Sequence, residues 1–247
     1  MTPAQQRDFQ AQGYLIIEGG LSPVKLDELR TAFDKMAAAD ALADLPNGDD
    51  CFKHLMLDAA FFPIVHRIMS DAVQLRSLRG SLCAPGAAAQ AWQQKVAGLL
   101  GVAHHASTIS IQLQIHLDET PVGGACTAVV PGSHRFAPDR QMPEADSVEA
   151  MADAQLLTVK AGTAIILHNN LWQAQTANRS KTAQRIICSD FVHCWMRHDL
   201  PELSAAALAA ISQSHNLSQL FGLGEHNSVV GYWERGIEGY PASAGLR

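Results

Sequence analysis

The stretch STISIQLQIHLDET, residues 107–120, constrains the fold of this chain more than any other segment. Aliphatic side chains occupy every second position from Ile109 to Leu117. The positions between them are polar: Ser110, Gln112, Gln114, His116 and Asp118. Successive side chains of a β-strand point to opposite faces of the sheet, so the alternation predicts a strand with one apolar and one polar face. A water-facing strand would usually carry Lys, Glu and Thr, so we favour a semi-enclosed polar interior, with a solvated face as the alternative.

Other segments have the character of short strands, because their apolar runs are bounded by Gly or Pro turns. They are GYLIIEG (13–19), GGACTAVVPGSH (123–134), LLTVKAGTAIILHNNLWQ (156–173, two strands) and RIICSDFVHCWM (185–196). Residues 84–106 are consistent with a strand that leads into a loop.

Helical signals gather toward the two ends of the chain. In LSPVKLDELRTAFDKM, Ser22 stands where a helix N-cap belongs and Pro23 takes the first helical position. The segments 59–78 and 203–222 are also predicted to be helical. Short strands with helices at the ends of the chain predict a mainly β fold with helices, a two-sheet jelly roll with N-terminal and C-terminal helical cover.

The length of 247 residues, 47% of them hydrophobic, favours a single domain spanning 1–247. Within it we expect a helical N-terminal part at about 1–80, a jelly-roll core at about 81–196 and a C-terminal helical extension at 197–247.

The charge and the cysteines narrow the classes of function. A net charge of −6 argues against a nucleic-acid partner, which usually requires a basic face. Five cysteines without CxxC spacing indicate neither a disulfide framework nor a structural zinc site. The N-terminus lacks a signal-peptide pattern, and there is no long apolar run, so we expect a cytoplasmic protein with no membrane partner.

Three blocks together point to a known family: FQAQGYLIIEGGLSPVKLDELRTAFDKM, IHLDETPVGGACTAVVPGSHR and GTAIILHNNLWQAQTANRSKTAQRI. From about residue 8 to 195 the chain resembles the phytanoyl-CoA dioxygenase-like family of iron(II)/2-oxoglutarate oxygenases. The resemblance implies a double-stranded β-helix, the cupin-like form of the jelly roll.

The resemblance also implies where a metal site would lie. The family binds iron through two His and one carboxylate, the first two as HxD, often after a tryptophan. Here the stretch after Trp92 reads Gln93, Gln94 and Lys95, and the position of the second His is occupied by Gln173. Amides are weak metal ligands, and an ammonium group repels a cation. We therefore expect no metal site and no cofactor, with both iron and 2-oxoglutarate lost.

The cosubstrate positions implied by the resemblance are altered as well. The arginine that binds 2-oxoglutarate in the family falls on Gln184, with Arg185 next to it. Arg185 can replace it only if the preceding turn holds one extra residue, because adjacent residues of a strand face opposite sides. The polar contact two residues after the second His corresponds to Gln175.

A relocated metal site is an alternative. His116-Leu117-Asp118 is itself an HxD, and His168 is a possible third ligand. Against this, the resemblance places His116 on the strand after the usual HxD strand, and His168 matches a family histidine that is not a ligand.

The leading hypothesis is a metal-independent, non-oxidative enzyme of the isomerase, cyclase or lyase type that acts on a small organic molecule in biosynthesis. Its candidate catalytic residues are Lys95, His116, Gln93 and Gln173. Candidate substrate-binding residues are Gln112, Gln114, Trp92, His168, Gln175 and Arg185. Lys95 is either a functional group in the cavity, with a lowered pKa, or a side chain that points out of the barrel mouth.

Two alternatives stay open: a non-catalytic partner of an active homologous oxygenase, and an iron(II)/2-oxoglutarate dioxygenase with a rearranged metal site. The expected partners are a small-molecule substrate and either a second copy of the chain or such an oxygenase.

Overall fold

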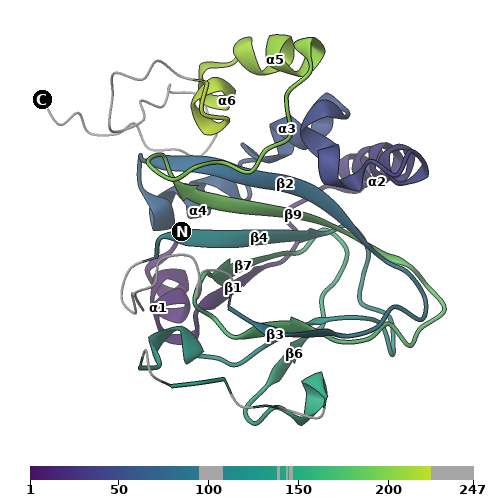
Figure 1. The fold of residues 1–247 in the computed structure, drawn as a ribbon, viewed down its shortest axis with the longest axis vertical. Helices are drawn as coiled ribbons and strands as arrows, with labels where there is room; N and C mark the ends of the chain where they lie inside the picture. Colours follow the sequence, from purple (N-terminus) through teal and green to yellow (C-terminus); the bar gives the residue numbers. More distant parts are fainter. Residues whose placement is uncertain (95–107, 138–139, 143, 145–146, 224–247) are drawn as a thin grey trace, which may run out of the picture.

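Two antiparallel sheets facing each other form the centre of the molecule (Figure 1). The computed structural model describes residues 1–94, 108–137, 140–142, 144 and 147–223. The larger sheet has the order β1 (Tyr14–Ile17), β7 (Ala164–His168), β4 (Ser110–His116), β9 (Gln184–His193) and β2 (Val73–Cys83). The smaller sheet has the order β3 (Gln90–Gln93), β8 (Gln173–Gln175), β5 (Thr127–Val129) and β6 (Gln155–Leu157). This arrangement confirms the predicted mainly β jelly roll with helices.

Strand β4 has the two faces that its alternation predicted. Ile111, Leu113 and Ile115 are buried in the main hydrophobic core. On the opposite face, Gln112 and Gln114 look toward the smaller sheet and line a cavity between the two sheets. Only 4% of Gln112 is exposed, so this polar face is enclosed rather than solvated. The interpretation of a semi-enclosed polar interior is therefore confirmed.

Helices cover the face of the larger sheet that points away from the cavity (Figure 1). They are α2 (Pro23–Ala38), α3 (Asp50–Leu55), α4 (Phe62–Met69), α5 (Ala205–Ser212) and α6 (His215–Leu220), while α1 (Pro3–Gln12) lies beside β1. Short 3-10 helices occur at η1 (Leu42–Asn47), η2 (Ser133–Arg135) and η3 (Val148–Ala150). Helix α2 starts as predicted, because the Ser22 hydroxyl accepts a hydrogen bond from the Lys25 amide.

The predicted helix over 59–78 is too long. Helix α4 ends at Met69, and residues from Val73 onward form β2, which pairs with β9 along ten register positions. A register shift between Leu75 and Ser77 interrupts the alternation of β2. This break hides the period of two from local pattern analysis, and the strand is held by partners more than a hundred residues away.

The N-terminal part contributes more than helical cover. β1 and β2 come from the predicted helical part at about 1–80, yet both belong to the larger sheet. Helix α1 was not predicted, although Thr2 and Gln5 form a reciprocal capping box at its start.

The single domain over 1–247, with its core at about 81–196, stays a prediction. Within the described residues, no helix is long and apolar enough to span a membrane.

Candidate functional site

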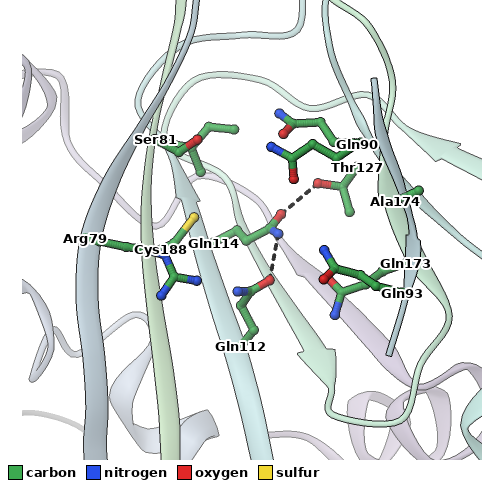
Figure 2. Close-up of a pocket in the computed structure, with 12 residues that line it drawn as sticks. Arg79, Ser81, Gln90, Gln93, Gln112, Gln114, Thr127, Gln173, Ala174 and Cys188 are labelled. Carbon is green, nitrogen blue, oxygen red and sulfur yellow. Dashed lines mark hydrogen bonds between the residues drawn. The ribbon is translucent and has the colours of Figure 1, made fainter. Parts of the chain in front are cut away.

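A polar cavity of about 130 Å³ lies between the two sheets (Figure 2). The larger sheet contributes Arg79, Ser81, Gln112, Gln114, Ile186 and Cys188. The smaller sheet contributes Gln90, Gln93, Thr127, Gln173, Ala174 and Gln175. Half of these twelve lining residues are glutamines, and Ala174 and Ile186 are the purely aliphatic ones. The cavity has room for more than one water molecule, and its walls demand hydrogen-bond partners.

Gln93 and Gln173 stand opposite each other in this cavity. They are Cα partners in the antiparallel pair of β3 and β8, and Gln90 and Gln175 form the next pair along these strands. Gln173 is 4% exposed, and its Nε2 has no hydrogen-bond partner among the described residues. A buried amide donor without a partner is costly, so this group is suited to a water molecule or a ligand.

Trp92 does not line the cavity, although it precedes Gln93. Its side chain packs with two hydrophobic clusters of the smaller sheet, beside Val148 and Trp172. Alternation along β3 explains this, because adjacent residues point to opposite faces. Its indole Nε1 is buried and has no partner among the described residues.

A chain of hydrogen bonds crosses the cavity from the larger sheet to the smaller one. Gln112 Nε2 donates to Asp190 Oδ1 over 3.2 Å, and Gln114 Nε2 donates to Gln112 Oε1 over 2.9 Å. The Thr127 hydroxyl then donates to Gln114 Oε1 over 2.7 Å (Figure 2). An ionised carboxylate only accepts hydrogen bonds. Asp190 therefore orients the first amide, which orients the second, and the direction of every bond in the chain follows.

Arg79 is a charged residue of the cavity that the sequence did not reveal. It comes from β2, and Figure 2 shows it across the cavity from Gln93 and Gln173. Its Nη1 donates to Ser77 Oγ at 3.2 Å and lies 3.5 Å from Asp190 Oδ2. The signal was missed because residues 59–78, directly before Arg79, were predicted to be helical, so strand β2 and its inward face were not recognised.

His116 is 1% exposed and does not line the cavity. Burial lowers its pKa to about 4, against the weaker opposite effect of the Asp118 carboxylate. Both ring nitrogens are buried and have no partner among the described residues. The imidazole is therefore neutral at pH 7.

His168 also lies away from the cavity lining, beneath α1. Its ring centroid is 4.8 Å from that of His134 and 6.0 Å from that of Phe9. Burial and, to a smaller extent, repulsion from His134 lower the pKa of His168 to about 3. Its Nδ1 accepts a hydrogen bond from the backbone N–H of Asn170. These contacts suit a role in packing α1 against the sheet.

Neither Gln184 nor Arg185 points into the cavity. The Arg185 guanidinium pairs with Asp34 of α2, at 2.7 Å, and with Asp118, at 3.0 Å. These partners raise the pKa of Arg185, the Asp34 hydrogen bond most strongly. Gln184 Nε2 donates to the Ala125 carbonyl. The extra turn residue needed to bring Arg185 inward is not present, so the structure does not place this predicted substrate-binding residue at the cavity.

The predicted site residues therefore fall into three groups. The cavity brings together Gln93, Gln112, Gln114, Gln173 and Gln175. Trp92, His116, His168 and Arg185 lie outside its lining. Lys95 lies outside the described residues. The roles assigned to all of them stay predictions.

Two facing antiparallel sheets around a central polar cavity define a double-stranded β-helix protein. The family model for Phytanoyl-CoA dioxygenase (PhyH) matches residues 9–186, and the chain belongs to this family. No curated protein matches the sequence.

Solved structures share the fold at low sequence identity. SnoK, a non-heme alpha ketoglutarate dependent carbocyclase from nogalamycin biosynthesis, is 17% identical over 78% of this chain and 85% of its own, with a TM-score of 0.64. HygX from Streptomyces hygroscopicus with iron bound is 14% identical over 80% and 89%, with a TM-score of 0.69. SnoN, a non-heme alpha ketoglutarate dependent epimerase from nogalamycin biosynthesis, is 16% identical over 82% and 88%, with a TM-score of 0.65.

These structures contradict the prediction that no cofactor belongs to this site. HygX is known with iron bound and also with nickel and 2-oxoglutarate bound, so proteins of this fold hold both a metal and the cosubstrate. The expected loss of iron and 2-oxoglutarate was inferred from the replaced ligand positions and the altered cosubstrate positions. That prediction is wrong, because structures of this fold carry both groups.

The described side chains of this chain nevertheless do not match the usual iron donors. Gln93 and Gln173 offer amide oxygens, which are weaker ligands than imidazole. Within the described residues, no group of three or more His, Cys, Asp or Glu is placed to hold a metal ion. This includes the alternative set of His116, Asp118 and His168, since Asp118 is held by Arg185 instead. The described residues therefore do not form a set of ligands suited to iron.

Proposed function

We propose that this chain is an enzyme that converts a small organic molecule in a biosynthetic pathway, with an isomerisation, cyclisation or elimination as its outcome. The observation that carries the proposal is the cavity between the sheets. Its oriented amides face a buried donor, Gln173 Nε2, that has no partner among the described residues. Side chains that need partners from the cavity are typical of a binding site for a polar molecule.

The hydrogen-bond chain supplies the chemistry of the proposed site. Asp190 directs the amides of Gln112 and Gln114, so these donors are oriented before a substrate arrives. Oriented donors in an enclosed site stabilise negative charge that develops on a substrate oxygen. Gln173 and Gln93 face them from the smaller sheet and would orient the substrate. Lys95, two residues beyond Gln93, is the proposed acid/base group.

Two neighbours of the same fold bear on the type of reaction. SnoK is named a carbocyclase and SnoN an epimerase, and these names fall within the proposed cyclase and isomerase classes. Both are also named alpha ketoglutarate dependent. The proposal therefore does not specify whether a metal and 2-oxoglutarate are required, and the experiment is run with and without them.

The test is a conversion assay on a library of polar metabolites, read by mass spectrometry, with and without added iron(II) and 2-oxoglutarate. We expect a product that has gained no oxygen atom, and we expect Gln173→Ala to slow its formation by about tenfold or more. Gln213→Ala, at an exposed helix end, is the matched control and should leave the rate unchanged. Lys95→Ala tests the acid/base assignment in the same assay.

Two results would overturn the proposal. A product that gains oxygen while 2-oxoglutarate becomes succinate identifies a dioxygenase. Failure to convert any library member, together with co-purification of a homologous oxygenase, identifies a non-catalytic partner.

A further inference from the structure

Arg79 contributes positive charge to a cavity whose described walls are otherwise neutral. The other described lining residues carry amides, hydroxyls, a thiol or aliphatic groups. Asp190 forms an ion pair with Arg79 at 3.5 Å but does not line the cavity, and its carboxylate also accepts hydrogen bonds from Ser77 Oγ and Gln112 Nε2. The described lining residues thus present one guanidinium and no carboxylate to a bound molecule.

Most of the hydrogen-bonding capacity of Arg79 is unused by the described residues. Both of its contacts, to Ser77 and to Asp190, are made through Nη1. A guanidinium has five N–H donors in a planar fork, which suits the two oxygens of a carboxylate. Nε and Nη2 have no partner among the described residues, so this side chain retains donors for an anionic group.

The glutamine side chains of the cavity indicate the chemistry of the rest of the ligand. Each glutamine both donates and accepts hydrogen bonds, as does each hydroxyl group of a ligand. The opposing amides of Gln93 and Gln173 on one side and Gln112 and Gln114 on the other would leave polar atoms unsatisfied against an apolar molecule (Figure 2). No aromatic ring is among the described lining residues. The walls therefore favour a molecule with several hydroxyl groups.

We infer that the cavity binds a polyhydroxylated carboxylic acid, with its carboxylate on Arg79 and its hydroxyl groups along the glutamines of the two facing sheets. This inference rests on the proposed function only in using the same cavity as the substrate site. It adds the substrate class, and Arg79 as the residue that selects for the acid.

Isothermal titration of the full chain with three probes tests both parts of this inference. Gluconate carries a carboxylate and hydroxyl groups, sorbitol carries hydroxyl groups without a charge, and hexanoate carries a carboxylate on an apolar chain. We expect gluconate to bind more tightly than either of the others. Arg79→Gln should weaken gluconate binding by about tenfold or more and leave sorbitol binding almost unchanged.

Arg76→Gln is the matched control, because Arg76 is on the same strand, loses the same charge and does not line the cavity. It should leave the preference for gluconate intact. Equal binding of gluconate to the Arg79 and Arg76 variants overturns the role of Arg79. Hexanoate binding as tightly as gluconate, or no gluconate binding at millimolar concentration, overturns the ligand class.

The proposed enzymatic function and the proposed ligand class can fail independently of each other. Gluconate binding that depends on Arg79, in a protein without any conversion activity, supports the ligand class while the enzymatic proposal fails. Conversion of an uncharged molecule without hydroxyl groups supports the enzymatic proposal and overturns the ligand class.

Discussion

The Thr127 hydroxyl donates a hydrogen bond of 2.7 Å to Gln114 Oε1 and thereby joins the smaller sheet to the larger one across the cavity. This contact ends the chain that begins at the Asp190 carboxylate. Thr127 is 4% exposed, so its hydroxyl is shielded from bulk solvent. The bond thus links the two walls and, together with the bond to Gln112, fixes the orientation of the Gln114 amide.

Thr127→Val should destabilise the protein by about 1–2 kcal/mol, because it leaves Gln114 Oε1 without its donor while preserving the shape of the side chain. Urea denaturation measures the free energy of unfolding. Thr182→Val, at an exposed position, is the control and should change stability by less than about 0.5 kcal/mol. Equal stability of the two variants would show that the bond between the sheets contributes nothing.

The buried His116 should make the protein less stable as the pH falls. Its pKa is about 4 in the folded chain and 6.5 ordinarily, so between these values the unfolded chain binds more protons. Stability is then lost on acidification from pH 6.5 toward pH 4, at up to about 1.4 kcal/mol per pH unit. Urea denaturation at a series of pH values measures this slope.

His116→Leu should remove this contribution, and His168, whose pKa is about 3, should retain its own in the same direction. The control is His198→Leu, because His198 is exposed. A slope that is the same in the His116 variant, the His198 variant and the parent chain contradicts the prediction.

Arg185→Gln should lower stability by about 1–3 kcal/mol, because it removes the shared partner of Asp34 and Asp118. Asp34 is exposed and screened, so most of the loss comes from the more buried Asp118. Arg179→Gln breaks the exposed ion pair with Glu149 and should cost less than about 1 kcal/mol. Thermal unfolding compares the two variants, and gluconate binding should be the same in both. A change in gluconate affinity confined to the Arg185 variant would place Arg185 in the site after all.

Gly13→Ala should be more destabilising than Gly19→Ala. Both glycines have a left-handed backbone, with φ of 82° and 66°, so each substitution costs about 1–2 kcal/mol. A Cβ at Gly13 would also lie 2.5 Å from His134 Nδ1, whereas nothing lies within 4 Å at Gly19. The difference in unfolding free energy between the two variants isolates the steric term. Equal losses would mean that His134 moves aside without cost.

The double variant Gln93→His with Gln173→His should bind Ni²⁺ about tenfold more tightly than either single variant, since two imidazoles on paired positions can share one ion. The parent chain, measured alongside by titration, sets the baseline. If a single variant gains as much Ni²⁺ affinity as the double variant, the two side chains do not converge on one ion.

Much of the candidate site follows from local pattern. The alternation in residues 107–120 predicted that Gln112 and Gln114 face inward, and the family resemblance placed Gln93 and Gln173 at one site, where the sheet pairs them directly. Side-chain alternation is a property of the extended backbone itself, so it can be predicted without knowledge of the partner strands.

The charged part of the site could not be predicted in this way. Arg79 lies on a strand whose alternation is broken by a register shift, and Asp190 acts through hydrogen bonds to residues from two other strands. Arg185 was a candidate for the cavity, but α2 brings Asp34 to the opposite face of β9 and holds the guanidinium there.

The sequence by itself determined the inward face of β4 and the start of α2, because each depends on backbone geometry within a few consecutive residues. It also determined the jelly-roll class, through the succession of short strands along the chain and the family resemblance. Only the tertiary structure decided which charge enters the cavity, which way its amides point and where Arg185 pairs. These features depend on strands brought together from distant parts of the chain, and register and hydrogen-bond direction between such strands are not encoded in any local period.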